Sequence, residues 1–374
     1  MALPLEGLRV LDLSRLLPGP YATLVLADLG ATVDKLEEPN GGDYIRAMGP
    51  GLFGALNRNK RSLTLDLKSP AGVAALKRLV RNYDVLVETF RPGVMDKLGV
   101  GWDVLHQENP RLVYCAISGY GQTGPDRLKA GHDLDYIARA GALAYGGEPG
   151  GRPAMPGAQM GDISGSLFGL IGLFAALYER QRTGQGRFVD VSMTETAMAF
   201  IHMHLGARLL AGPEGKPLQR GVEALNGGYA CYGLYETKDA KWLAVGALEP
   251  KFFMGVCAVL ERPDLVENAY DTSGGSARVR AELEKIFKTK TRAEWLEAFA
   301  AADVCVEPVN EGDEVLSDPQ LKARGMFVGD QLRTPVNLGP LPTRAPPELG
   351  QHTDEVLREA GFSADEIAAM LPKA

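Results

Sequence analysis

Cysteine is scarce in this chain of 374 residues, which contains four. They are Cys115, Cys231, Cys257 and Cys305. No two of them form a C-x-x-C pair, and this wide spacing argues against a zinc site or a disulfide framework. We expect most of them to be small buried hydrophobic residues instead.

An excess of basic residues is also missing. The chain has 40 Lys and Arg against 47 Asp and Glu, which gives a formal net charge of −7. Proteins that bind nucleic acids need a basic surface for their phosphate contacts, so this balance argues against a nucleic-acid partner. It is still compatible with an anionic small ligand, since a local basic pocket can occur in an acidic protein.

Long apolar runs are absent as well. The most apolar stretch, residues 167–177, is expected to be too short for a bilayer and to be broken by its glycines. Residues 1–7 lack the basic start and the apolar core of a signal peptide. With 45% hydrophobic and 23% charged residues, the composition is that of a globular protein. We therefore expect a cytoplasmic enzyme without a membrane partner.

Short apolar runs alternate with helical patterns over the first two thirds of the chain. Strands are predicted at 8–13, 32–36, 85–90, 112–118 and 188–192. Helices are predicted at 22–29, 71–81, 102–107, 133–144 and 164–180. Strands that alternate with helices indicate a parallel sheet covered on both faces, and hence an α/β fold.

The pattern changes after about Ala211. A polar connection at 213–226 leads into two alternating segments that resemble a hairpin around Lys238-Asp239-Ala240. The hairpin segments are 229–237 and 242–245, and helices are predicted at 251–260, 278–288 and 292–302. This pattern predicts a separate α+β unit.

The sequence therefore predicts a large domain at 1–212, a small domain at 213–330 and a C-terminal segment at 331–374. The C-terminal segment contains a proline-rich run, which is typical of an extended chain on the surface. A short helix at 353–360 is expected to end the fold.

Residues 119–124 match the pattern G-x-G-x-x-G and follow a predicted strand. A dinucleotide-binding fingerprint also needs a helix that begins inside the motif and an acid about twenty residues later. Here Pro125 follows the third glycine, and the later region is helix and glycine-rich loop. We interpret the segment as a turn that lets the backbone approach a ligand, and we expect no nicotinamide or flavin.

Two segments place an ionisable side chain at a predicted helix start. In Gly131-His132-Asp133, the imidazole of His132 is either a general base near pH 7 or the N-cap of the helix. Asp133 is an alternative residue for the N-cap. Asp162 lies between small residues and is either an N-cap or an acid, base or nucleophile. Glu249-Pro250 is typical of a helix start.

Basic residues cluster near two predicted strand ends. One group is the segment 57–61, and the other comprises Arg91 and Lys97 after Phe90. Cations at such places can hold phosphates, and a solvated surface is the alternative. His202 and His204 are two apart on a helix, so their rings diverge and a metal pair is not expected.

Taken in order, these segments resemble the class III coenzyme A transferase family, and within it the α-methylacyl-CoA racemase branch. The similarity runs along nearly the whole chain. The blocks that carry it include LEGLRVLDLS, PGPYA, NKRSLTLDLKSP, DVLVETFRPGVMDKLG, ISGYGQTGP, AGHDLDYIA, ALYERQRTGQGRFVDVSM and VGALEPKFF.

The resemblance implies a Rossmann-like α/β large domain that contains both chain ends, a smaller α+β domain, and two subunits interlocked as a homodimer. Coenzyme A is implied as part of the substrate, with no metal and no other cofactor. The residues that match the nucleotide-binding positions are Arg61, Phe90, Arg91 and Lys97. Glu38 stands where relatives often carry Arg, which puts one phosphate or adenine contact in doubt.

The resemblance also implies which residues carry the chemistry. His132 matches the racemase G-H-D histidine, where many transferases have Tyr. Asp162 aligns with a carboxylate that is the second base in racemases and the acyl-accepting nucleophile in transferases. Glu249 matches a glutamate that supports the histidine, and Asp133 matches a neighbouring carboxylate. Residues 226–230 depart from the D-G-G-A-P of racemase relatives at the border of the acyl pocket.

We therefore expect an α-methylacyl-CoA racemase that works by 1,1-proton transfer through an enolate. His132 removes the α-proton from one face, and protonated Asp162 donates to the other face. Backbone N–H groups near Gly161 and Asp162 are expected to bind the enolate oxygen. The alternative is a CoA-transferase in which Asp162 forms a mixed anhydride with the acyl group. A non-catalytic acyl-CoA binding module would not need the histidine and the carboxyl to converge.

Overall fold

The computed structural model describes residues 2–370, which form two compact units. The first unit comprises residues 2–140, 157–199 and 323–370, and the second comprises 141–156 and 200–322. These borders differ from the predicted domain borders, chiefly because 141–156 belong to the second unit. Side chains of the later segment hold them there: Arg220 donates to the carbonyl of Ala144 at 2.9 Å, and Asn226 donates to the carbonyl of Tyr145 at 3.1 Å.

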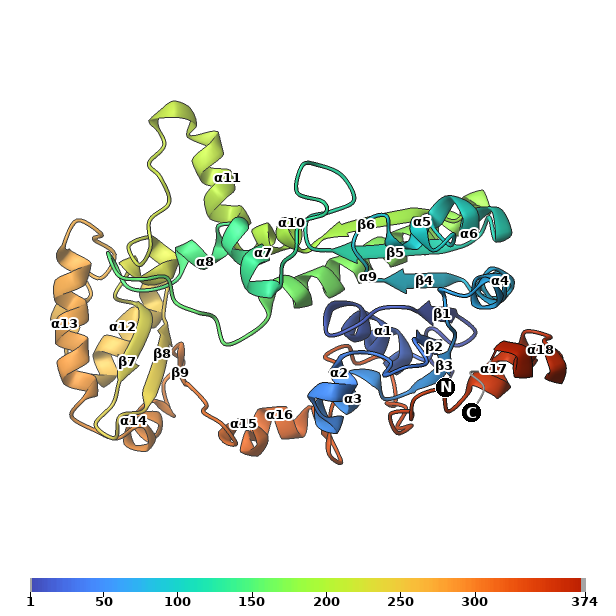
Figure 1. Cartoon of the computed structure of the whole chain (residues 1–374). Helices are drawn as coiled ribbons and strands as arrows, with labels where there is room; N and C mark the ends of the chain where they lie inside the picture. The colour runs from blue at the N-terminus through green and yellow to red at the C-terminus, as the bar shows by residue number, and fades with distance from the viewer. Residues whose placement is uncertain (1, 371–374) are drawn as a thin grey trace. The chain divides into compact units, whose positions relative to one another are not determined.

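The first unit is built on a six-stranded sheet in which every pair of neighbours is parallel (Figure 1). The strands are β1 (Arg9–Asp12), β2 (Thr32–Glu37), β3 (Lys60–Thr64), β4 (Val85–Glu88), β5 (Val113–Ser118) and β6 (Phe188–Ser192). Their order is β3-β2-β1-β4-β5-β6, which is the Rossmann order. The predicted α/β parallel sheet is confirmed. In such sheets ligands bind beyond the carboxyl ends of the strands where the order reverses, here between β1 and β4.

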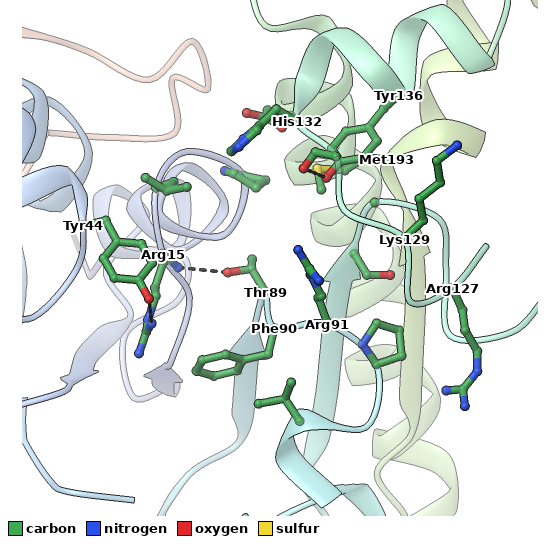
Figure 2. Close-up of a pocket in the computed structure, with 18 residues that line it drawn as sticks. Arg15, Tyr44, Thr89, Phe90, Arg91, Arg127, Lys129, His132, Tyr136 and Met193 are labelled. Atoms are coloured by element: carbon green, nitrogen blue, oxygen red, sulfur yellow. Dashed lines mark hydrogen bonds between the residues drawn. The ribbon is translucent and has the colours of Figure 1, made fainter. Parts of the chain in front are cut away.

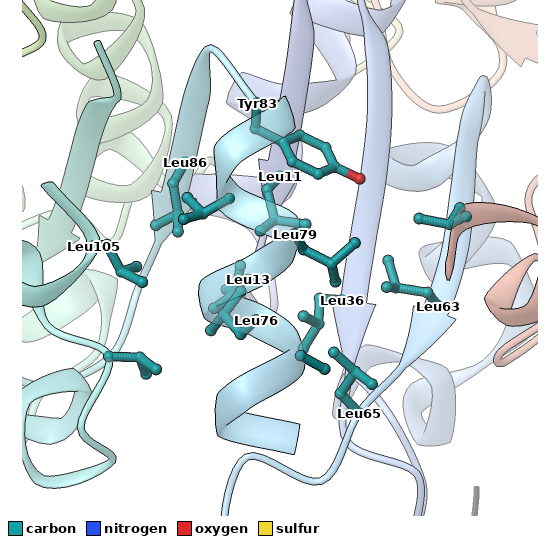
Figure 3. Packing of buried hydrophobic residues seen from close by; sticks show 14 of the residues in the cluster. Leu11, Leu13, Leu36, Leu63, Leu65, Leu76, Leu79, Tyr83, Leu86 and Leu105 are labelled. Carbon is teal, nitrogen blue, oxygen red and sulfur yellow. The ribbon is translucent and has the colours of Figure 1, made fainter. Parts of the chain in front are cut away.

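Helices cover both faces of this sheet. They are α1 (Pro18–Asp28), α2 (Ile45–Met48), α3 (Pro50–Asn57), α4 (Pro70–Leu79), α5 (Val94–Lys97), α6 (Trp102–Glu108), α7 (Asp133–Arg139), α9 (Met160–Thr183), α10 (Met193–Ala197), α17 (Thr353–Glu359) and α18 (Ala364–Met370). On one face, leucines of the strands and of α4 pack together in a buried apolar core (Figure 3). The prediction that a helix at 353–360 ends the fold was wrong, because α18 follows it and contributes the buried Ile367.

Strand β3 was not predicted, because it begins with two charged residues. Lys60 is fully buried and donates to Asp12 at 3.1 Å and to Thr23 at 2.8 Å. Arg61 is buried beside Asp34, with Nε to Oδ1 at 2.6 Å. Charged side chains enter a protein interior only when partners satisfy them, and those partners come from other strands and helices. The local sequence therefore gives little sign of this strand.

Helix α9 contains the apolar stretch that was expected to be too short for a bilayer and broken by glycines. It is a continuous helix of 24 residues, and by length and composition alone it could cross a membrane, so that expectation was wrong. The glycines instead bring it close to the sheet. A Cβ on Gly172 would lie 2.5 Å from Val189, and one on Gly169 would lie 3.2 Å from Ile117. The helix thus packs as a core element of the α/β unit.

The second unit has a three-stranded antiparallel sheet in the order β7-β8-β9, covered by helices. Its elements are α8 (Ala142–Tyr145), α11 (His202–Leu210), β7 (Tyr232–Glu236), β8 (Trp242–Gly246), α12 (Pro250–Val259), α13 (Gly275–Phe287), α14 (Arg292–Phe299), β9 (Val306–Pro308) and α15 (Glu314–Ser317), with α16 (Pro319–Ala323) at its border. The predicted hairpin is confirmed as β7 and β8. The third strand was missed because three residues that end in proline give no alternating pattern.

Short elements complete the description. An antiparallel pair, β10 (Phe327–Val328) and β11 (Gln331–Leu332), precedes the proline-rich run in the first unit. That run is tied down by Arg46 and Asn59, which donate to the carbonyls of Pro347 and Pro342. Three of the four cysteines are buried and Cys305 is half-buried, which confirms the expectation of buried thiols.

Candidate active site

A cavity of about 420 Å³ lies at the carboxyl ends of β1, β4 and β5, where the strand order reverses (Figure 2). The residues that line it include Arg15 and Leu16 after β1, Thr89, Phe90 and Arg91 after β4, Gly119 after β5, His132 and Tyr136 of the α7 region, Asp162 of α9 and Met193 of α10. Parallel strands bring these loops together, although the lining residues extend from Arg15 to Met193 along the chain.

His132 stands at the N-cap position of α7 with its imidazole on the cavity. Its backbone N–H donates to the carboxylate of Asp135 at 2.9 Å, which fixes the start of the helix. Its exposed side chain makes no capping hydrogen bond within the part of the chain that the structure describes. The sequence left a cap and a general base as alternatives. The Asp135 carboxylate forms the reciprocal half of a capping box, and the imidazole stands at the capping position while it also lines the cavity.

Asp162 lies in the first turn of α9 and is half-buried on the wall of the same cavity. Burial, and to a smaller extent the negative charge of Asp133, raises the pKa of Asp162 to about 7. A carboxyl with this pKa carries its proton for a large part of the time at neutral pH. It can therefore donate a proton, as an acid opposite a histidine base must.

Asp133 joins the two helices that carry His132 and Asp162. Its Oδ1 accepts hydrogen bonds from the backbone N–H of Gly161 at 2.7 Å and of Asp162 at 3.0 Å. The first N–H groups of a helix have no partner within the helix, and a carboxylate there also interacts favourably with the helix dipole. Asp133 is thus a positioning residue between α7 and α9. The N–H groups of Gly161 and Asp162 themselves donate to Asp133, and the binding of an enolate oxygen by N–H groups near these residues stays a prediction.

Tyr136 completes the wall and was missed from the sequence. Its hydroxyl donates to the carbonyl of Gly131, and its ring packs over Gly119, where a Cβ would lie 2.4 Å from the ring. The glycine pattern at 119–124 therefore gives room to an aromatic side chain, and no helix begins inside it. The sequence did contain one signal for Tyr136: it follows His132 by four residues in a predicted helix, and residues with this spacing lie on the same face of a helix.

Basic side chains surround the cavity. Of the four predicted nucleotide-binding residues, Phe90 and Arg91 line it. Arg15, Arg127 and Lys129 also line it and were not predicted. The ion pairs found within residues 2–370 involve other cations, so these guanidinium and ammonium groups have no carboxylate partner there. The wall therefore carries uncompensated positive charge, which favours an anionic ligand.

Arg61 and Lys97 are placed differently. Lys97 is exposed on α5 and does not line the cavity. The guanidinium of Arg61 donates to Asp34, to Glu359 at 2.8 and 3.0 Å and to Glu355 at 2.9 Å. These contacts attach helix α17 to the edge strand β3, and they use the guanidinium N–H groups that a phosphate would need. This placement does not support a nucleotide contact at Arg61.

We expect Arg61→Ala to lower the free energy of unfolding by about 3 kcal/mol, because it leaves the buried Asp34 with weakened compensation. Urea unfolding measures this change. The Kd of coenzyme A is expected to change less than about twofold, which corresponds to less than ~0.5 kcal/mol of binding free energy. The matched control is Arg358→Ala, whose exposed pair with Asp354 is expected to contribute at most about 0.5 kcal/mol. If the Arg61→Ala variant is as stable as the wild type but binds coenzyme A more weakly, Arg61 is a nucleotide-binding residue after all.

Three further predicted positions are now placed. Glu249 lies in the second unit at the N-cap position of α12, with an exposed side chain, and its support of His132 stays a prediction. Glu38 pairs with Lys68 at 3.3 Å on the surface. Asn226, the first residue of the departure from D-G-G-A-P, donates to the carbonyls of Tyr145 and Gln219. An aspartate there would lack both N–H donors, so the departure serves the local fold of this unit.

Metal chemistry has no evident ligand set here. Over residues 2–370, no group of three or more His, Cys, Asp or Glu side chains is arranged to hold a metal ion.

Comparison with known proteins places the chain. It matches the model of CoA-transferase family III over residues 5–353. The protein belongs to this family. It is 37% identical over 374 residues to "Alpha-methylacyl-CoA racemase" of Homo sapiens, with 97% of this chain and 95% of the relative covered. It is 35% identical over 380 residues to "Succinyl-CoA:glutarate CoA-transferase" of Homo sapiens, with 95% of this chain and 86% of the relative covered.

The solved structures agree with this assignment. A CAIB/BAIF family protein from Brucella suis superposes with a TM-score of 0.84 at 31% identity, covering 96% of this chain and 100% of that one. The family predicted from the sequence is confirmed, and an enzyme acting on acyl-CoA is consistent with it. Racemases and CoA-transferases occur among the relatives at similar identity. Membership in CoA-transferase family III therefore does not select one of the two reactions.

Proposed function

We propose that this family III protein is an α-methylacyl-CoA racemase that moves the α-proton of an acyl-CoA thioester between His132 and Asp162. One observation carries the proposal. The two side chains line the same cavity, and burial keeps a proton on Asp162 near neutral pH. A base and a protonated acid on one ligand site are the requirement for a two-base proton transfer.

The proton balance follows from these two groups. Neutral His132 takes the α-proton from one face of the α-carbon, and the thioester becomes an enolate. Protonated Asp162 then returns a proton to the opposite face, which inverts the stereocentre. Imidazolium and carboxylate remain, and they are the starting pair for the reverse reaction. The cationic wall with Arg91 stabilises the negative charge that develops on the enolate.

The second candidate is transfer of coenzyme A between carboxylic acids. The carboxylate form of Asp162 would attack the thioester carbon, form a mixed anhydride and release the coenzyme A thiolate. The thiolate would then attack the Asp162 carbonyl carbon and release the first acyl group as its carboxylate. A second carboxylate would finally take the coenzyme A from Asp162 as a new thioester, which regenerates the Asp162 carboxylate. The uncompensated cations of the cavity suit a substrate carboxylate, and a pKa of about 7 leaves Asp162 partly ionised at neutral pH.

Deuterium exchange separates the two reactions. Incubated with a 2-methylacyl-CoA in deuterated water and no acceptor acid, the enzyme is expected to incorporate deuterium at the α-carbon and to racemise the substrate. Mass spectrometry and chiral chromatography of the product measure the two events. Absence of exchange without a free acid, together with coenzyme A transfer once an acid is added, would establish the second candidate instead.

We also propose that the enzyme is a cytoplasmic homodimer of interlocked subunits. The support is the outer face of α9, where apolar side chains remain exposed in the single chain. They are Leu167, Phe168, Ile171, Phe174 and Tyr178. A contiguous apolar face of this kind marks a surface that a partner covers.

A further inference from the structure

The turn between β1 and α1 contributes two residues to the cavity wall, Arg15 and Leu16. Leu16 has a φ of +63°, in the left-handed region that residues other than glycine and asparagine rarely adopt. Such a conformation persists only where the surroundings over-determine it, and it occurs mostly at functional sites. The contacts that hold this turn therefore bear on what it presents to a ligand.

Asp43 and Tyr44 hold the turn from one side. Asp43 Oδ1 accepts the backbone N–H of Leu16 at 3.0 Å, and the Tyr44 hydroxyl lies 2.9 Å from an Arg15 guanidinium nitrogen. On the other side, the backbone N–H of Arg15 donates to Thr89 Oγ1 at 3.0 Å (Figure 2). The Arg15 guanidinium also lies over the ring of Phe90, 5.0 Å from its centroid. Arg15 is thus held between two loops of the cavity.

Lys35 of β2 ties this arrangement to the interior. Its Nζ lies 3.0 Å from Asp43 Oδ2 and donates to the carbonyl of Ser14 at 2.7 Å. Both charged side chains are completely buried. A buried ion pair contributes little net stability compared with a well-packed apolar pair, because both charges lose their hydration. What this pair does provide is a fixed position for both ends of the turn.

We propose that Lys35 and Asp43 are positioning residues that keep Leu16 left-handed and thereby present the Arg15 guanidinium to a phosphate of coenzyme A. The inference rests on the proposed acyl-CoA function and deepens it, since it adds Arg15 as a binding residue for the nucleotide part of the substrate. Arg15 has no carboxylate partner within residues 2–370, so its charge is available to an anion. A guanidinium held in place binds phosphate more tightly than a free one, because less side-chain entropy is lost.

A double-mutant cycle on coenzyme A binding tests this. By isothermal titration calorimetry, Arg15→Ala is expected to raise the Kd of coenzyme A about tenfold, and Asp43→Ala about fivefold. In the Arg15→Ala background, Asp43→Ala is expected to change the Kd less than about twofold, because it acts through Arg15. An equal effect of Asp43→Ala in both backgrounds would overturn the proposal and leave Asp43 a general structural residue.

The matched control is Asp28→Ala, which removes another buried carboxylate of the same unit, paired with Arg58 at 2.5 Å. It is expected to lower the melting temperature without changing the Kd. If Asp43→Ala does not fold, Asp43→Asn is used in the same cycle, since it keeps one oxygen for Leu16 but loses the charge facing Lys35. Wild-type protein that does not bind coenzyme A would sink the proposed function itself. Binding that is insensitive to Asp43 would sink only the positioning role.

Discussion

Replacing His132 with alanine is expected to slow α-proton exchange by about 10²- to 10⁴-fold, the range that a positioned general base contributes. The imidazole lines the cavity and makes no structural hydrogen bond within the described chain. Its removal should therefore leave the fold and the contacts to the coenzyme A moiety intact. The KM for the acyl-CoA is expected to stay within about threefold, less than ~1 kcal/mol of binding free energy.

Wash-in of deuterium, followed by mass spectrometry, measures this effect. The control is His202→Ala, which removes an exposed histidine of the second unit that does not line the cavity and should leave the rate unchanged. Proton exchange at the wild-type rate in the His132 variant would refute the two-base mechanism. If that variant instead keeps full coenzyme A transfer to an acceptor acid, the reaction is the transferase one.

Replacing Asp162 with asparagine is expected to abolish exchange and, in addition, to stabilise the protein at alkaline pH. The ordinary pKa of an aspartate side chain is 3.8, and burial in the folded chain raises the pKa of Asp162 to about 7. Between these values the folded state holds a proton that the unfolded state has lost. Wild-type stability therefore falls as the pH rises toward 7, by about 1.4 kcal/mol per pH unit at most. Asparagine carries no charge and escapes this loss.

Urea unfolding at pH 5 and pH 8 tests the second effect. The free energy of unfolding of Asp162→Asn, relative to wild type, should rise by about 2 kcal/mol between these pH values. The control is Asp354→Asn, because the pKa of this exposed carboxyl is lowered by Arg358 and the side chain stays ionised at both pH values. The same stability difference at pH 5 and pH 8 would show that Asp162 is not held protonated, and the acid role would fail.

More of the sheet than of the candidate site could be predicted from the sequence. The apolar runs of β1, β4 and β5 were recognisable, because strands buried on both faces need apolar side chains throughout. Helix α9 was recognised, but its glycines were misread as breaks, since nothing local shows that Val189 and Ile117 need their space. His132 and Asp162 were singled out as candidates, yet each was equally compatible with a simple helix cap.

The sequence by itself determined the alternation of strands and helices, the family, and the two ionisable residues at helix starts. Periodic burial and helix-end chemistry are local, so they are visible in short segments. Only the tertiary structure decided that Asp133 occupies the N–H groups of α9, that Arg61 faces carboxylates rather than the cavity, and that Asp43 fixes the turn with Arg15. These roles depend on partners many residues away, because hydrogen bonds and desolvation are set by what surrounds a group in space.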